Sequence, residues 1–152
     1  MTPLFAKLNL KDEATIHVIG APPSFDGALQ QLSGVDVKRT ITPKTRTTFG
    51  MAFAVTQADL DVRSAVLARA AEGDAVIWIA YPKGTSKRYR CEFNRDTGWT
   101  VLAAAGFEPV RMVAIDEDWS ALRFRRVEYV KSLTRDASRT LTAEGKKRAT
   151  KT

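Results

Sequence analysis

The chain is poor in the two residues that carry most thiol and metal chemistry. Its 152 residues include one cysteine, Cys91, and one histidine, His17. A single cysteine forms no internal disulfide, and a reducing cytoplasm is the expected environment. Zinc sites and Cys/His dyads need several such residues together, so the sequence predicts no metal centre and no dyad. His17 lies between Ile16 and Val18, a context typical of a histidine satisfied inside a strand.

Long apolar segments are also absent. No run approaches the ~20 apolar residues that cross a bilayer. The segment Met1–Lys7 lacks the charged and apolar regions of a signal peptide. We therefore expect a cytoplasmic protein with no membrane partner. The length of 152 residues fits one domain with one core.

The formal net charge of +7 comes mostly from the end of the chain. Residues 131–152 contain seven basic and two acidic side chains, which leaves only +2 for residues 1–130. Beyond about Leu133, the Ser/Thr/Lys/Arg-rich composition predicts a disordered basic tail over 133–152, after a single domain over 1–132. Such a tail gives weak, nonspecific affinity for nucleic acid. The alternative is a solvated tail that only aids solubility.

Segments typical of strands alternate with segments typical of helices. The predicted strands are Thr15–Ala21, Val35–Ile41, Phe49–Thr56, Asp74–Tyr81, Val110–Ile115 and Ala121–Val130. Alternation of this kind indicates a parallel sheet with right-handed crossovers. The last two strands are joined by too few residues for a crossover, so they must pair antiparallel. The predicted fold class is α/β, a three-layer Rossmann-like, mostly parallel sheet of about six strands with a C-terminal antiparallel hairpin.

Capping residues mark where the predicted helices begin. Ser24 is the expected N-cap of the first helix. The spacing of Thr56 and Asp59 is that of a capping box and begins a helix that runs to about Ala71. Asn94 or Asp96 is the expected cap of a third helix, which carries Trp99 and Leu102 on its buried face.

Four motifs resemble a bacterial family of unknown function. They are Pro3-Leu4-Phe5-Ala6-Lys7-Leu8, Gly20-Ala21-Pro22, Trp78-Ile79-Ala80-Tyr81-Pro82-Lys83 and Ala114-Ile115-Asp116-Glu117-Asp118-Trp119-Ser120. The third fits Trp-x-Ala-[Tyr/Trp]-Pro-Lys and the fourth fits Ala-[Ile/Val]-Asp-Glu-x-Trp-Ser. The resemblance covers residues 3 to about 131. The order of elements is also similar to a class I methyltransferase core with one strand–helix unit missing, so the resemblance implies that fold.

The methyltransferase resemblance also shows what the chain lacks. Enzymes of that class hold S-adenosylmethionine with a glycine-rich turn after the first strand and an acidic residue at the end of the second. Here the first turn contains Pro22 and Pro23, which have no amide donors, and no Gly-x-Gly. The predicted second strand ends in Lys38-Arg39-Thr40-Ile41, without a carboxylate. We therefore expect no S-adenosylmethionine and no other cofactor. A Gly-x-x-x-x-Gly-Lys-[Ser/Thr] phosphate loop is absent as well.

The loop after the predicted strand Asp74–Tyr81 is the first candidate site. It supplies cations, hydroxyls and a glycine: Lys83, Gly84, Thr85, Ser86, Lys87 and Arg88. Ligands of open α/β sheets bind outside the carboxyl ends of strands. Side chains of this kind hold phosphate or carboxylate by charge-assisted hydrogen bonds, and Tyr81 and Tyr89 can stack on a base or ring. The alternative is a solvated loop with ordinary surface cations.

The second candidate is the acidic segment before the last strand. The candidates within the run Asp116-Glu117-Asp118-Trp119-Ser120 are Asp116, Asp118 and Ser120, with Trp119 as an aromatic neighbour. Clustered carboxylates serve as acid and base or hold a divalent metal. The alternative is a charged turn in which an Asp satisfies turn amides and Trp119 packs as a lid. A third interpretation pairs Asp116 or Asp118 with Arg123 or Arg125 across the hairpin.

Three functional hypotheses follow. The first is a non-catalytic Rossmann-like module that binds an anionic small molecule, such as a phosphate-bearing ligand, or a partner at the carboxyl edge of the sheet. The second is an enzyme of unrecognised type that uses Asp116, Asp118 and Lys83. The third is a protein that binds nucleic acid weakly through its tail. A pocket shared by Lys83 and the 116–120 turn would favour the second hypothesis.

Overall fold

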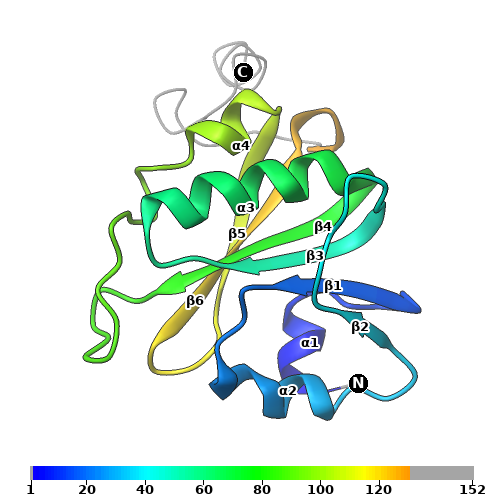
Figure 1. Ribbon diagram of the computed structural model, residues 1–152, viewed down its shortest axis with the longest axis horizontal. Coiled ribbons are helices and arrows are strands. Elements are labelled where there is room, and N and C mark those ends of the chain that lie inside the picture. The colour runs from blue at the N-terminus through cyan, green and yellow to red at the C-terminus, as the bar shows by residue number, and fades with distance from the viewer. Residues whose placement is uncertain (1, 131–152) are drawn as a thin grey trace.

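Six strands form one sheet in the computed structural model, which describes residues 2–130 (Figure 1). The strands are β1 (Thr15–Ile19), β2 (Asp36–Lys38), β3 (Thr47–Phe53), β4 (Ala71–Pro82), β5 (Phe107–Ala114) and β6 (Trp119–Arg126). Their spatial order is β2-β1-β3-β4-β6-β5. The first four strands run parallel, and β6 is antiparallel to both of its neighbours. The predicted fold class is confirmed.

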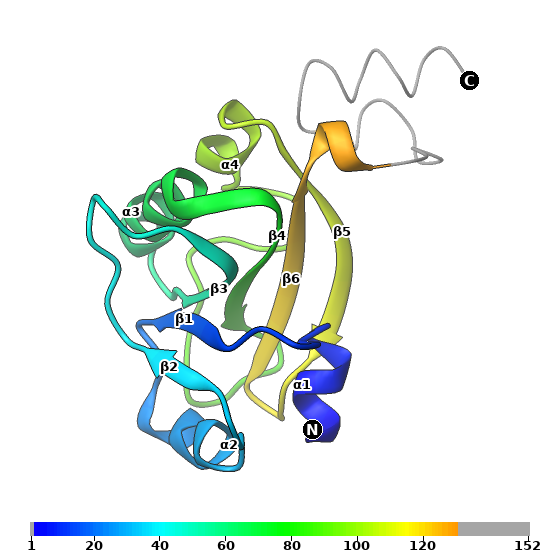
Figure 2. The same ribbon diagram turned by 90° about the vertical axis from the view of Figure 1, so that its right-hand side faces the viewer.

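Helices cover both faces of the sheet, which gives three layers (Figure 2). The helices are α1 (Pro3–Lys7), α2 (Asp26–Gln30), α3 (Gln57–Ala70) and α4 (Thr100–Ala104), with short 3-10 turns at Pro23–Phe25 and Val127–Tyr129. Phe5 of α1 and Leu29 of α2 belong to one buried cluster, whereas Leu67 of α3 and Leu102 of α4 belong to another. The sheet therefore separates an α1/α2 face from an α3/α4 face.

Strand β4 lies at the centre and supplies both cores. Every residue from Ala75 to Pro82 is buried, as expected for a central strand covered on both faces. Trp78 and Ala80 point to the α1/α2 core, and Ile77, Ile79 and Tyr81 point to the α3/α4 core. The Trp78 indole donates to the Leu8 carbonyl oxygen at 2.8 Å, which ties the chain after α1 to the sheet.

The β5–β6 hairpin brings the acidic turn to the edge of the sheet where β4 ends. Pro82 at the end of β4 is paired in register with Trp119 at the start of β6. The carboxyl end of β4 and the β5–β6 turn therefore lie side by side. The loop that begins at Lys83 also starts from this edge.

The first predicted helix and the second predicted strand are shorter than the sequence indicated, because local turns end or delay them. The expected cap Ser24 lies inside a 3-10 turn that begins at Pro23, and α2 starts only at Asp26 without a side-chain cap. Strand β2 spans three residues in place of Val35–Ile41. Beyond β2 the Arg39 side chain turns to Asp26, at 3.0 Å.

The third predicted helix is also shorter, and its expected cap was wrong. The Asn94 side-chain oxygen accepts from the amides of Asp96 and Thr97, which closes a turn. Gly98 then adopts a φ of +96°, and α4 begins only at Thr100. The cap at Thr56 is confirmed, because its hydroxyl accepts from the Asp59 amide at 3.1 Å. Helix α1 was not predicted.

Within residues 2–130, no helix is long and apolar enough to cross a membrane. No group of three or more His, Cys, Asp or Glu side chains in that part of the chain is placed to hold a metal ion. The predicted tail, residues 133–152, lies outside the described residues, as does the boundary proposed between 132 and 133.

Candidate functional site

A pocket of about 960 Å³ opens where β4 ends. We call it the loop pocket, because residues 83–95 of the loop after β4 form most of its wall. Tyr81 and Pro82 of β4, Met112 of β5 and Ser120 of β6 complete the lining. Tyr81 and Ser120 are neighbours in the β4–β6 register. The aromatic residues Tyr81 and Phe93 place this pocket on the α3/α4 face of the sheet.

The wall of the loop pocket is strongly cationic. Its five basic residues are Lys83, Lys87, Arg88, Arg90 and Arg95. Its one acidic residue, Glu92, accepts a hydrogen bond from the Gln57 amide at 2.9 Å and so stabilises the start of α3. Among residues 2–130, the ion pairs of the structure include Arg88 but none of the other four cations. The pocket therefore presents positive charge that its own carboxylate does not neutralise.

The floor of the loop pocket is aromatic. The rings of Tyr81 and Phe93 lie with centroids 5.8 Å apart, and Trp99 packs edge-on to both behind them. The Tyr81 hydroxyl contacts the Met112 sulfur at 3.8 Å. Burial raises the pKa of Tyr81 above its usual value, so the hydroxyl stays protonated. The floor suits an apolar ring, and the wall suits an anion.

A second pocket, of about 580 Å³, lies between the loop and the β5–β6 turn. We call it the turn pocket. Thr85, Lys87 and Arg88 line one side, and Glu117 and Asp118 line the other. The loop and the turn thus meet in one concavity, although Lys83 and Ser120 line the loop pocket. The geometry places part of each candidate set together but does not gather Asp116, Asp118 and Lys83 in one site.

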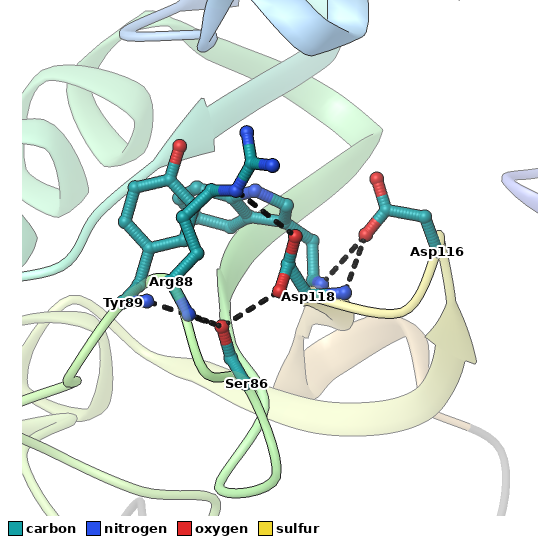
Figure 3. Close-up of polar contacts among 6 residues, drawn as sticks. Ser86, Arg88, Tyr89, Asp116 and Asp118 are labelled. Carbon is teal, nitrogen blue, oxygen red and sulfur yellow. Dashed lines mark hydrogen bonds and ion pairs between the residues drawn. The ribbon is translucent and has the colours of Figure 1, made fainter.

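Ser86 holds the loop together (Figure 3). Its hydroxyl donates to Asp118 Oδ1 at 2.8 Å and accepts from the amides of Arg88 and Tyr89, at 3.2 and 3.1 Å. A serine hydroxyl has one donor and two acceptor positions, and all three are used. Ser86 therefore shapes the loop, and the neighbouring cations are better placed to contact a ligand.

The two candidate aspartates are bound within the protein (Figure 3). Asp116 Oδ1 accepts from the amides of Asp118 and Trp119, both at 2.8 Å, the turn interpretation named above. Asp118 accepts from Ser86, and its other oxygen lies 3.9 Å from Arg88 Nε. Neither pairs with Arg123 or Arg125 across the hairpin. The partner of Arg125 is Asp74, at 2.6 Å.

Three other predicted site residues have clear positions. Trp119 is 3% exposed and packs against Phe53 and Tyr89 on the α1/α2 face, so it is a packing residue. Gly84 has open space where a Cβ would lie, so its backbone makes no close approach within the protein. Lys83 donates its amide to the Asp118 carbonyl oxygen at 2.8 Å, which leaves its side chain at the pocket wall.

Sequence reasoning missed several residues of the loop pocket, among them Arg90, Phe93, Arg95 and Met112. One signal was present in the sequence. Residues 83–95 contain five basic residues and one acidic residue, so the cationic stretch extends past Arg88. Met112 comes from β5, and only the strand order brings it beside the loop.

The topological switch point of the sheet lies elsewhere, between β1 and β3. The chain leaves β1 through α2 toward β2, and leaves β3 through α3 toward β4 on the opposite face. At the end of β1, Gly20 has a φ of +72°, and a Cβ there would lie 2.7 Å from the Arg63 guanidinium. That guanidinium donates to the Phe53 carbonyl oxygen and lies 3.7 Å from Asp59. Arg63 therefore fills the space where such folds receive ligands.

The fold is similar to those of solved methyltransferases. A SAM-dependent methyltransferase from Aquifex aeolicus matches with a TM-score of 0.57 at 15% identity, covering 82% of this chain and 88% of that one. The N-methyltransferase NodS from Bradyrhizobium japonicum matches with a TM-score of 0.51 at 13% identity, covering 80% and 91%. At such identities the likeness shows the fold alone. Comparisons with protein-family models and with curated proteins find no match for this chain.

The residues at the switch point do not fit S-adenosylmethionine. The turn after β1 carries Pro22 and Pro23, which have no amide hydrogens, and the Phe25 amide already bonds to the Pro22 carbonyl oxygen. Strand β2 ends at Lys38, and Arg39 follows it. Strand β2 itself supplies no carboxylate at this end to accept from ribose hydroxyls, and the Asp26 carboxylate is ion-paired with Arg39. Together with the Arg63 guanidinium, these features argue against the cofactor.

Cys91 lines the loop pocket as a protonated thiol. Burial raises the pKa of the Cys91 thiol, and the Glu92 carboxylate acts in the same direction. Alkylation requires the thiolate, so the pH midpoint of iodoacetamide modification is expected to lie higher in the native protein than in the urea-unfolded chain. Cys91 is the only cysteine, so mass spectrometry follows it without ambiguity. A native midpoint at or below the unfolded one would contradict the burial argument.

Proposed function

We propose that this chain is a binding module for an anionic small molecule that carries an aromatic ring. The loop pocket is the observation that supports this function. Five cations line its wall, its one carboxylate is already hydrogen-bonded, and Tyr81 and Phe93 form its floor. Guanidinium and ammonium groups bind phosphate and carboxylate by charge-assisted hydrogen bonds. Phosphate-bearing ligands are the class that fits best.

The positions of the acidic residues favour binding over catalysis. A general acid or base must reach the proton that it transfers. Asp116 Oδ1 and Asp118 Oδ1 are both hydrogen-bonded inside the turn and loop. Asp118 lines the turn pocket, whereas Lys83 lines the loop pocket. The enzyme hypothesis based on these three residues therefore has weaker support.

The test compares a ligand that has both features with ligands that have one. We expect adenosine monophosphate to raise the melting temperature more than inorganic phosphate or adenosine does at equal concentration and ionic strength. A ligand at 100 times its dissociation constant stabilises the native state by about 2.7 kcal/mol. Lys83→Ala is expected to remove most of the gain with adenosine monophosphate. Differential scanning calorimetry measures both effects.

Lys11→Ala is the matched control, because Lys11 is an exposed cation outside the loop pocket. It removes the same charge and should keep the full ligand effect. If both variants lost the ligand-induced rise in melting temperature equally, the effect would come from the overall charge of the protein and not from a binding site. No difference between wild type and Lys83→Ala would overturn the proposal.

Methyl transfer is the alternative that the fold itself raises. The solved structures of similar fold include methyltransferases that use S-adenosylmethionine, whereas the switch point here holds Arg63 and two prolines. We therefore expect no specific binding of S-adenosylmethionine. Isothermal titration calorimetry measures the dissociation constant for S-adenosylmethionine. A one-to-one dissociation constant below roughly 10 μM, about −7 kcal/mol, would reverse this conclusion and favour a methyltransferase.

A further inference from the structure

A separate concavity of about 420 Å³ surrounds the only histidine of the chain. We call it the His17 hollow. It is lined by Ala14, Thr15, His17, Lys38, Thr45, Arg46, Thr47, Thr48 and Glu72. None of these residues lines the loop pocket or the turn pocket. The proposed function therefore leaves this hollow without a role.

The hollow exists because the α3/α4 layer does not extend over the whole sheet. Helix α3 packs on β3 and β4, and its Leu67 covers Gly50 of β3. His17 is the next residue in register beyond Gly50, and Lys38 of the edge strand β2 follows it. The chain from β2 to β3 crosses this region as a loop without a helix, as Figure 2 shows. No helix of the described residues covers this polar part of the sheet face, and the β2–β3 loop lines the hollow instead.

The hydrogen bonds of Thr47 decide which nitrogen of His17 carries the proton. The Thr47 hydroxyl lies 2.8 Å from the Phe49 carbonyl oxygen, which only accepts, so the hydroxyl hydrogen points there. The Thr47 hydroxyl oxygen also accepts from the Phe49 backbone amide at 3.2 Å. Its contact with His17 Nδ1, at 2.8 Å, must therefore be a second accepted bond, with the hydrogen on Nδ1. Nε2 of the neutral ring is then a bare acceptor.

The ring stays neutral near neutral pH. Burial lowers the pKa of His17, the Lys38 ammonium lowers it further, and the Asp36 carboxylate opposes them. His17 is 8% exposed, and Thr47 fixes its orientation. The hollow therefore contains a preorganised acceptor that needs a hydrogen-bond donor from a ligand.

Cations stand beside this acceptor. Lys38 is the cross-strand neighbour of His17 in β2 and lies 3.2 Å from Asp36. Arg46 uses one terminal nitrogen for the Arg69 carbonyl oxygen at 3.3 Å. A guanidinium has five donors, so Arg46 retains others for a ligand. Glu72 is the one carboxylate among the residues that line the hollow, against the two cations Lys38 and Arg46. A ligand that fits therefore combines negative charge with a donated proton.

We propose that the His17 hollow binds an oxyanion that keeps a hydroxyl hydrogen near neutral pH, of the class of inorganic phosphate. The P–OH group donates to His17 Nε2, and the charged oxygens face Lys38 and Arg46. Fully ionised oxyanions such as sulfate have no hydrogen to donate. The proposal therefore makes the donated proton, more than the charge, the basis of selection.

Nuclear magnetic resonance tests the selection directly. With one histidine in the chain, a long-range ¹H–¹⁵N spectrum shows one pair of imidazole nitrogens and needs no assignment by mutation. We expect inorganic phosphate to shift the Nε2 resonance saturably, with a midpoint at or below ~10 mM, about −2.7 kcal/mol. Sulfate at the same ionic strength should leave Nε2 where it was. Nδ1 should keep its hydrogen throughout.

Two variants separate this site from the loop pocket. Lys38→Met removes the cation beside His17 and is expected to weaken the phosphate midpoint several-fold. Its side chain is more than half exposed, so folding should be preserved. Lys83→Ala should leave the Nε2 titration unchanged, even though it is expected to remove most of the ligand effect in the loop pocket. The proposal would be overturned if the Nε2 chemical shift did not change with phosphate, or changed equally with sulfate.

Discussion

Replacing Trp119 with alanine is expected to lower the free energy of unfolding by about 3–5 kcal/mol. The indole is 3% exposed. Its ring lies 5.1 Å from Phe53 and 4.9 Å from Tyr89, measured between centroids. Phe53 in turn contacts Phe25 of the turn after β1, at 4.9 Å. Alanine would leave a cavity between the start of β6, the end of β3 and the loop after β4.

Chemical denaturation measures this loss, and a second substitution shows its cause. The buried Trp119 indole nitrogen has no hydrogen-bond partner among the described residues. Trp119→Phe therefore removes an unsatisfied donor and part of the ring volume, and should cost much less than alanine. Trp78→Phe is the matched comparison, since the Trp78 indole donates to the Leu8 carbonyl oxygen. An unchanged midpoint for Trp119→Ala would mean that the ring is exposed and available for recognition.

The architecture was predictable because its signals are local in sequence. The unbroken apolar segment up to Tyr81 indicated a central strand, and the short connection at Asp116–Asp118 required an antiparallel hairpin. The capping pair Thr56 and Asp59 gave the start of α3. Each of these features depends on a few neighbouring residues, so periodicity and turn chemistry were sufficient.

Element ends were less predictable, because competing turns use the same residues. Asn94 and Ser24 are both good caps by type. Asn94 bonds the two amides that follow it within a turn, and the 3-10 turn at Pro23 places Ser24 inside that turn. Side-chain preference does not distinguish these outcomes. The geometry of the whole connection decides between them.

The sites were only partly predictable, because tertiary contacts assemble them. The sequence placed cations after β4, but not the Ser86–Asp118 hydrogen bond that shapes their loop. Nothing local indicated that Arg63 of α3 would lie against Gly20. The hydrogen on Nδ1 of His17 likewise follows from Thr47 of β3, which lies beside His17 only once β1 and β3 have paired.

Replacing Gly20 with alanine is expected to destabilise the protein by about 2–4 kcal/mol, for two separable reasons. The first is backbone strain, since a φ of +72° costs an L-residue roughly 1–2 kcal/mol. The second is steric. The new Cβ would lie 2.7 Å from Arg63 Cζ and Nη1, and would push the guanidinium away from the Phe53 carbonyl oxygen that it contacts.

A double-mutant cycle separates the two costs and tests whether Arg63 fills the switch point. In an Arg63→Ala background the steric cost disappears, so Gly20→Ala should cost only about 1–2 kcal/mol, the backbone strain. Gln57→Ala is a suitable control background, because Gln57 lies on the same helix as Arg63 but away from Gly20. Its side chain bonds to Asp61 of that helix and to the Gly98 carbonyl oxygen. There the full cost of Gly20→Ala should remain. If Gly20→Ala costs the same in the wild-type and Arg63→Ala backgrounds, the guanidinium does not occupy the space beside Gly20. The switch point would then be open to a ligand, and the argument against S-adenosylmethionine would rest on Pro22, Pro23 and the missing carboxylate alone.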